Sequence, residues 1–261
     1  MKIITFLTDF GLKDGYVSQM KGVVSSITDA RMVDITHEIS PQNINQGAFI
    51  LKSVVDFFPE GSVHVAVVDP GVGTNRKGLI ISTKKFILVG PDNGLLIPAA
   101  KLLGNFDVYE ITNKKYMNKS LSNTFDGRDV FSPVAAHISN GVSFEDIGYM
   151  INEYINLDFG CGNKKNNVIY GKIIHIDRFG NIITNICLDL VNNIDFGKKI
   201  KILLGFKEFN INFVKSYGFV NKNEILCTIG SGNYFEIGIR SGNAAKKLSV
   251  DFGDNIEIYI D

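Results

Sequence analysis

The sequence has no long apolar run and no surplus of charge of either sign. No apolar stretch approaches the roughly 20 residues that a membrane-spanning helix needs, and the N-terminus lacks a signal-peptide pattern. The 27 basic and 27 acidic side chains cancel, which argues against a nucleic-acid partner bound through counterion release. We therefore expect a cytoplasmic protein whose partners include neither a membrane nor a nucleic acid.

Cysteine is scarce, and the histidines are scattered. Cys161, Cys187 and Cys227 are far apart in the sequence and form no CxxC pair. This spacing favours reduced thiols over a disulfide framework or a zinc site. The four histidines show no HExxH or other ligand spacing, so we predict no metal site.

Several motifs of known chemistry are also missing. Asp-Phe-Gly occurs at 9–11, 158–160 and 251–253, but no HRD catalytic loop accompanies it. Gly71-Val72-Gly73 lacks the third glycine of GxGxxG, and there is neither a Walker A sequence nor a GxSxG elbow. These absences leave phosphate cradling and a serine nucleophile without support.

The two halves of the sequence differ in their hydrophobic patterns. Hydrophobic residues make up 45% and charged residues 21%, which excludes disorder. Residues 1–157 alternate strand-like runs with helix-like ones, which predicts an α/β domain with a mainly parallel central sheet. The runs that predict strands are 2–8, 31–35, 63–68, 79–82 and 86–89, and those that predict helices are 16–27 and 46–58.

The second half reads differently, because the helical periodicity fades after residue 167. Short strand-like runs separated by Gly, Asn and Asp predict a small antiparallel β-barrel or sandwich over 168–261. The polar, Gly/Asn-rich stretch 158–167 is typical of a linker. The predicted strands are 168–176, 182–186, 199–204, 209–214, 224–229, 234–239 and 255–260.

Compact polar loops follow three predicted strands of the first half, at 8–11, 69–76 and 90–94, and a fourth polar cluster occupies 124–129. Any one of them is compatible with ordinary turn chemistry, which uses the same residue types. Ligands of open α/β sheets bind at the carboxyl ends of strands, however. Four such loops in one half therefore indicate a site.

The chain contains the ordered motifs TDFG (8–11), DPGVGTNR (69–76), GPDNGLL (90–96), TFDGRDVF (124–131), HIDRFGNIITN (175–185), GSGNY (230–234) and GNAA (242–245). Together these motifs resemble the S-adenosylmethionine (SAM) hydroxide adenosyltransferase family, the hydrolase branch of a group that includes SAM-dependent chlorinases and fluorinases. The resemblance implies an N-terminal α/β domain, a C-terminal β-barrel and a homotrimer. It also implies that SAM binds between one subunit's N-terminal domain and its neighbour's C-terminal domain, with no further cofactor.

The implied reaction is attack of water or hydroxide on ribose C5′, which releases methionine and leaves adenosine. In the family an Asp-Arg-His set handles the water, and Asp69 and Arg76 match its first two members. Asp126 stands where the family has histidine, so this chain departs from the family's water-handling set at one position. A carboxylate can accept a hydrogen bond from water while an arginine orients it, and we expect Arg76 and Arg128 to offset repulsion between Asp69 and Asp126. The plain alternative is a loop-stabilising salt bridge.

The resemblance also implies substrate-binding roles. The aspartate of TDFG takes the ribose hydroxyls, and the aspartate and asparagine of HIDRFGN lie near the methionine end. The two phenylalanines would form apolar walls for adenosine, although core packing is an equally good reading of them. The serine belongs to the segment that approaches the methionine carboxylate, and the backbone around the alanine approaches adenine. These residues are Asp9, Phe125, Asp177, Phe179, Asn181, Ser231 and Ala244.

Two other functions compete with SAM hydrolysis. A halogenase needs no base, and a carboxylate beside its halide would repel it, so Asp69 and Asp126 disfavour this reading. In the halogenases a tyrosine stands where this chain has Asp69. A sensor that binds SAM or adenosine without turnover is the other alternative, kept open by the loss of the family histidine at Asp126.

Overall fold

The computed structural model describes residues 2–260. The chain consists of two compact units, and the boundary between them lies after Asp158. Of the stretch 158–167 that we predicted as a linker, Asn163–Lys165 forms strand β8, which pairs with a strand of the second unit. Among the residues described, no helix combines the length and apolar character needed to cross a membrane.

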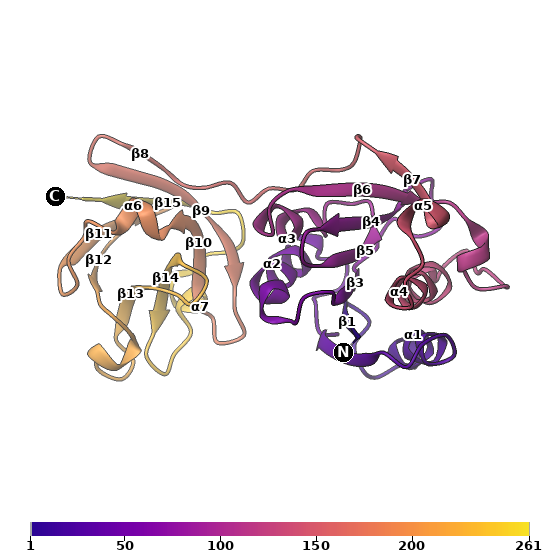
Figure 1. Ribbon diagram of the computed structural model, residues 1–261. Helices are drawn as coiled ribbons and strands as arrows, with labels where there is room; N and C mark the ends of the chain where they lie inside the picture. Colours follow the sequence, from indigo (N-terminus) through magenta and orange to yellow (C-terminus); the bar gives the residue numbers. More distant parts are fainter. Residues whose placement is uncertain (1, 261) are drawn as a thin grey trace. The chain divides into compact units, whose positions relative to one another are not determined.

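The first unit is a seven-stranded sheet with the order β2-β1-β3-β5-β4-β6-β7 (Figure 1). Neighbours among β2, β1, β3 and β5 are parallel, whereas β4 is antiparallel to β5 and β6, and β7 to β6. Five of the seven strands thus run in one direction, and the predicted α/β fold is confirmed. The strands are β1 (Ile3–Thr8), β2 (Arg31–Thr36), β3 (Val63–Val67), β4 (Gly78–Thr83), β5 (Ile87–Pro91), β6 (Phe106–Ile111) and β7 (Gly148–Ile151).

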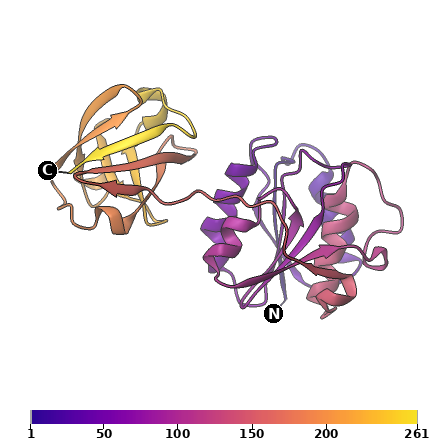
Figure 2. The ribbon, with the colours of Figure 1, turned by 90° about the horizontal axis from the view of Figure 1, so that it is seen from above.

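Helices cover both faces of this sheet (Figure 2). On one face α1 packs against α4, and on the other α2 packs against α3. The strands supply apolar side chains to both faces: in β1, Phe6 joins the cluster with Met20 of α1, and Leu7 lies next to Gly47 of α2. The helices are α1 (Tyr16–Ser25), α2 (Ile44–Val54), α3 (Ile97–Leu102), α4 (Ser132–Ser139) and α5 (Phe144–Ile147), with 3₁₀ turns at Val55–Phe57 and Lys114–Tyr116 and a π-helical segment at Gly127–Phe131.

The second unit is a closed β-barrel of seven strands in the order β10-β14-β13-β12-β11-β15-β9, closed by the pairing of β9 with β10. All pairs in the barrel are antiparallel except β12 with β13, which is parallel. The strands are β9 (Val168–Ile176), β10 (Ile182–Cys187), β11 (Lys199–Leu204), β12 (Lys207–Phe213), β13 (Ile225–Ile229), β14 (Tyr234–Ile239) and β15 (Asn255–Tyr259). Two short helices, α6 (Leu188–Val191) and α7 (Ala244–Leu248), and a 3₁₀ turn at Tyr217–Phe219 complete the unit.

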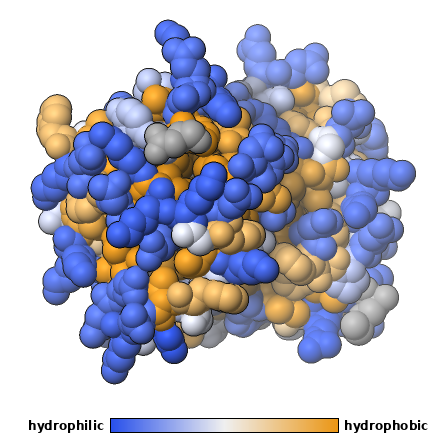
Figure 3. Space-filling view, turned by 90° about the vertical axis from the view of Figure 1, so that its left-hand side faces the viewer, coloured by the Kyte–Doolittle hydropathy of each residue, from blue (hydrophilic) through white to orange (hydrophobic). Residues whose placement is uncertain are grey.

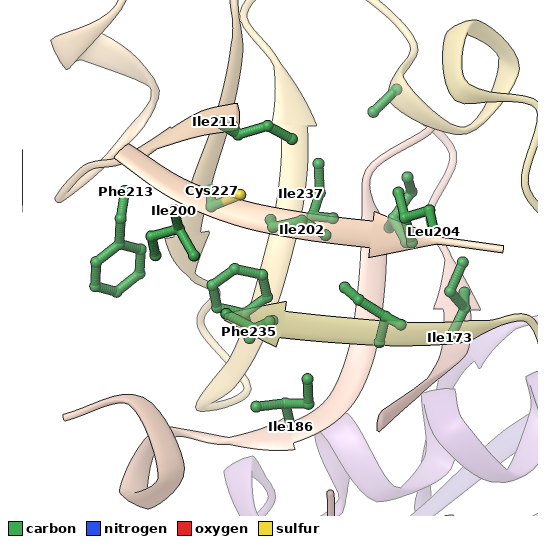
Figure 4. Packing of buried hydrophobic residues seen from close by; sticks show 14 of the residues in the cluster. Ile173, Ile186, Ile200, Ile202, Leu204, Ile211, Phe213, Cys227, Phe235 and Ile237 are labelled. Carbon is green, nitrogen blue, oxygen red and sulfur yellow. The ribbon is translucent and has the colours of Figure 1, made fainter. Parts of the chain in front are cut away.

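Alternating side chains explain why these strands close into a barrel. In β11, Ile200, Ile202 and Leu204 are buried, whereas Lys199 and Lys201 are exposed and Leu203 is half-buried. Figure 4 shows the inward-facing side chains of several strands, including Phe235 and Ile237 of β14, packed into one core. Outward-facing polar and apolar side chains are interspersed on the face of the molecule in Figure 3.

Candidate functional site

The connectivity of the first sheet brings two of the motif loops to one edge. From β1 the chain passes to β2 on one side, and from β2 it crosses to β3 on the other side of β1. Since β1 and β3 are parallel, their carboxyl ends meet at the same edge, and crevices at such reversal points hold the ligands of open α/β sheets. Asp9 follows β1, and Asp69 follows β3 by two residues. The topology therefore places both aspartates where a ligand is expected.

Arg76 links two carboxylates at this edge. Its Nε donates to both oxygens of Asp69 at 3.0 Å, and its Nη2 donates to Asp69 Oδ2 and to Asp126 Oδ2. The Phe131 ring lies 5.2 Å from the guanidinium carbon. The predicted contact between Asp69 and Arg76 is confirmed, and Asp126, 50 residues further along the chain than Arg76, joins it.

The two carboxylates of this group differ in access. The Asp69 side chain is 5% exposed, against 24% for Asp126, with Arg76 at 11%. Nη1 of Arg76 donates to the Lys77 carbonyl at 3.3 Å, so every nitrogen of the guanidinium is engaged within the protein. The carboxylate oxygens keep lone pairs that can accept hydrogen bonds from a water molecule. The group can thus hold a water and take up its proton.

Gly73 lets the 69–76 loop approach the segment before Phe125. Its φ is +77°, a left-handed conformation, and a Cβ at this position would lie 2.5 Å from the Asn123 carbonyl oxygen. The Thr74 hydroxyl donates to the Gly71 carbonyl at 2.6 Å and tightens the same turn. A glycine is therefore required where these two loops touch.

A buried ion pair fixes the backbone after Asp126. Asp129 is fully buried and accepts hydrogen bonds from Arg128 Nε at 2.7 Å, Asn118 Nδ2 at 2.9 Å and the Ser122 amide at 2.8 Å. Burial alone would raise the pKa of Asp129, but these hydrogen bonds outweigh it and hold that pKa well below its usual range. Arg128, which we expected to offset the charges of Asp69 and Asp126 together with Arg76, donates hydrogen bonds to Asp129.

Asp9 lies beside an aromatic cluster. Its Oδ2 accepts a hydrogen bond from the Gln42 amide at 2.8 Å. The ring centroid of Phe125 is 5.6 Å from that of Phe10, the residue after Asp9, and 5.4 Å from that of Tyr16. Because Phe125 directly precedes Asp126, this cluster joins the Asp9 loop to the carboxylate pair. Phe10 and Tyr16 were absent from our predicted site, and only the position of Phe10 next to Asp9 signals its involvement.

In the barrel, three predicted binding residues form one turn between β9 and β10. Asp177 Oδ1 accepts hydrogen bonds from the amides of Phe179 and Asn181, both at 2.9 Å, and its Oδ2 accepts one from Asn181 Nδ2 at 2.8 Å. The Gly180 carbonyl accepts a hydrogen bond from the Ala245 amide at 3.0 Å, which brings the buried Ala244 to the same turn. Phe179 is 73% exposed, so it is not part of the barrel core.

Ser231 is not brought to this turn. It lies in the turn between β13 and β14, where the Asn233 carbonyl accepts a hydrogen bond from the Leu188 amide just beyond the end of β10. Asn181 instead immediately precedes β10. Because β10 and β14 are antiparallel, the residues before β14 and those before β10 lie at opposite ends of the strand pair. The barrel therefore groups Asp177, Phe179, Asn181 and Ala244 and separates Ser231 from them.

Comparisons with known proteins agree with this architecture. The models of the N-terminal and C-terminal domains of the SAM hydroxide adenosyltransferase family match residues 4–148 and 171–257. The chain belongs to this family. It is 42% identical to the (R)-S-adenosyl-L-methionine hydrolase of Methanocaldococcus jannaschii, over 99% of this chain and 96% of that protein.

A solved structure and a more distant enzyme are also similar to this chain. A crystal structure of an uncharacterized conserved protein from Thermotoga maritima superposes with a TM-score of 0.93 at 38% identity, covering 98% of this chain and 99% of that one. A fluorinase from an Actinoplanes species is 27% identical over 82% of this chain and 83% of that protein. The hydrolase is therefore the more similar of the two named enzymes.

Proposed function

We propose that the chain hydrolyses SAM to adenosine and L-methionine. The observation that carries this proposal is the pair of carboxylates joined by Arg76 at the carboxyl edge of the sheet, in a chain of this family. Water attacks C5′ of the ribose, the C5′–S bond breaks, and methionine leaves with the electron pair on its sulfur. The proton that water loses needs an acceptor, which a carboxylate supplies.

In this scheme Asp69 is the base. Arg76 holds its carboxylate in one orientation through two hydrogen-bonding nitrogens. Asp126 replaces the histidine of the family as the second group beside the water. A carboxylate only accepts hydrogen bonds when ionised, whereas a neutral histidine also donates one, so we expect slower turnover than a histidine would give.

Substrate contacts are assigned to both units. Asp9 accepts hydrogen bonds from the ribose hydroxyls, and Phe125 packs against adenosine. In the barrel, Asp177 Oδ2 accepts one hydrogen bond from Asn181 and retains capacity for the methionine ammonium. Phe179 and the backbone at Ala244 line the adenosine. Ser231 lies away from these residues, so its position does not support its assignment to the methionine carboxylate.

Three further points belong to the proposal. The chain assembles as a homotrimer, with one substrate contacted by residues from two subunits, and it works in the cytoplasm. SAM is the only small molecule that the reaction requires besides water. These points rest on the family resemblance. Among residues 2–260 no three His, Cys, Asp or Glu side chains gather as a metal site would need.

The test is chromatography of SAM incubated with the protein in the presence of EDTA. We expect adenosine and methionine to form in proportion to protein concentration, and Asp69→Asn to abolish most of this. SAM that binds without conversion at high protein concentration would favour the sensor, the alternative that Asp126 keeps open. Formation of 5′-chloro-5′-deoxyadenosine in chloride buffer would indicate a halogenase instead.

A further inference from the structure

Two cysteines that are distant in the sequence meet in the second unit. The sulfur atoms of Cys161 and Cys187 are 2.8 Å apart, against about 2.05 Å in a disulfide. Cys161 is exposed and Cys187 is partly buried, so a small reagent can reach the pair. Both residues are thiols in this structure, as we predicted from their spacing, but that spacing gave no sign that they are neighbours.

The neighbouring backbone holds these two thiols together. The Gly162 amide donates to the Asn185 carbonyl at 2.8 Å, and Asn185 Nδ2 donates to the Phe159 carbonyl at 3.0 Å. A Cβ on Gly162 would lie 3.4 Å from the Cα of Ile186. The segment 159–162 thus lies directly beside the end of β10, and its contacts with β10 flank Cys161 on both sides.

We propose that Cys161 and Cys187 are a redox modification site, at which a low-molecular-weight disulfide such as oxidised glutathione converts the two thiols into a reversible intramolecular disulfide. The proposal does not depend on the function proposed above. The third cysteine, Cys227, is fully buried in the barrel core (Figure 4), and burial raises the pKa of its thiol well above the usual range. Cys227 is therefore the internal control.

The exchange takes place in two steps. The exposed Cys161 thiolate attacks one sulfur of the small disulfide, which forms a mixed disulfide and releases the first small thiol. The Cys187 thiolate then attacks the Cys161 sulfur and releases the second small thiol. The two protein thiols lose two protons and two electrons in total, and the small disulfide is reduced to two thiols.

The new bond would close a loop that contains β8, β9 and the turn bearing Asp177 and Asn181. Cys161 and Cys187 are 26 residues apart, so the cross-link removes conformational freedom from the unfolded barrel. We expect the oxidised protein to unfold at a higher denaturant concentration than the reduced protein. A Cys161→Ser variant should show no such difference between the two conditions.

The experiment uses the full chain, reduced and then treated with oxidised glutathione, followed by alkylation, intact mass measurement and peptide mapping. We expect two of the three thiols to disappear, the mass to fall by two hydrogens, a linked Cys161–Cys187 peptide, and reversal by dithiothreitol. Cys187→Ser should accumulate a glutathione adduct on Cys161, because the resolving thiol is gone. Cys227→Ala should behave as the wild type does.

Three results would overturn the proposal. One is a stable glutathione adduct on Cys161 of the wild-type chain, which would mean that Cys187 does not resolve it. Another is a disulfide between two chains on a non-reducing gel. The third is retention of all thiols when the glutathione pool is fully oxidised. Each of these can be read without any assay of SAM turnover.

Discussion

Arg76 serves two carboxylates unequally. Asp69 accepts three hydrogen bonds from it and is almost fully buried, whereas Asp126 accepts one and is more exposed. A carboxylate held by several charge-assisted hydrogen bonds has a fixed orientation, which a base needs in order to face its water. For the proposed reaction we therefore expect Asp69 to be the base and Asp126 to have an auxiliary role.

This assignment predicts a ranked set of variants. Asp69→Asn should slow adenosine formation by about 100-fold, because it removes the base. Asp126→Asn should cost less, and Asp126→His should raise the rate because it restores a neutral donor beside the water. Single-turnover formation of adenosine measures all three. If Asp126→Asn matches the wild type, Asp126 is a bystander, and if it costs more than Asp69→Asn, the two roles are exchanged.

The buried side chain of His64 should make the stability of the protein depend on pH. It is fully buried between Phe58 and Phe86, its Nδ1 lies 2.8 Å from the Thr5 hydroxyl, and burial lowers its pKa to about 4. The folded state keeps His64 neutral at pH values where the unfolded state binds a proton, so stability falls as pH drops from about 6.5 to 4.

A His64→Leu variant should lose this part of the acid sensitivity. The wild type should lose about 3 kcal/mol of unfolding free energy across that range through this group, and the variant should not. Urea unfolding between pH 7 and pH 4, followed for both proteins, measures the difference between their slopes. Parallel slopes would mean that another group carries the acid response.

At the scale of elements, the turn between β9 and β10 is locked to the start of α7. Gly180 has a φ of +85°, and a Cβ there would lie 2.1 Å from the Asn243 side chain. Asn243 is not free to move away, because its Oδ1 accepts the Lys246 amide at 2.7 Å and caps α7. The turn with Asp177 and Asn181 therefore depends on a glycine.

Gly180→Ala should destabilise the barrel by about 3 kcal/mol through this clash and the disturbed cap. Gly253→Ala is the matched control. Gly253 also has a positive φ, +89°, but a Cβ there meets nothing within 4 Å, so about 1 kcal/mol of backbone strain is expected. Denaturant unfolding compares the two variants. Equal losses would show that the contact with Asn243 has no cost.

The helices and strands differ in how well the sequence predicts their bounds. We predicted β9, β11 and β14 residue for residue, because apolar runs or alternation mark them. We did not predict β8, whose residues Asn163–Lys165 are all polar and form a strand only by pairing with β9. The start of α2 at Ile44 was predicted two residues late, although Asn43, which caps it, is a signal.

In the candidate site, too, some contacts can be predicted from the sequence and others depend on the fold. Asp69 and Arg76 lie seven residues apart on one loop, so their contact follows from local chemistry. The pairing of Arg128 with Asp129 instead of the other two carboxylates depends on the path of the π-helical segment, which no pattern in the sequence marks. The separation of Ser231 from Asn181 likewise depends on the pairing of β14 with β10.

At the scale of the whole molecule, predicted binding residues occur in both units, each with its own hydrophobic core. We expect these residues to act on one substrate through different subunits of a trimer. Mixing inactive Asp9→Ala chains with inactive Asn181→Ala chains, after dissociation and reassembly, should then restore part of the activity. Reassembled Asp9→Ala chains alone are the control. A fully active monomer in light scattering would contradict the trimer.

We propose that water attacks C5′ of SAM at the site formed by Asp69, Arg76 and Asp126. The most direct measurement is SAM turnover in water enriched in oxygen-18, with mass analysis of both products. We predict adenosine that carries the heavy oxygen in its 5′-hydroxyl, unlabelled methionine, and far less of both with Asp69→Asn. Labelled homoserine together with methylthioadenosine would place the attack on the methionine side chain. SAM left bound and unconverted would show that there is no hydrolysis. Either result would contradict attack of water on C5′.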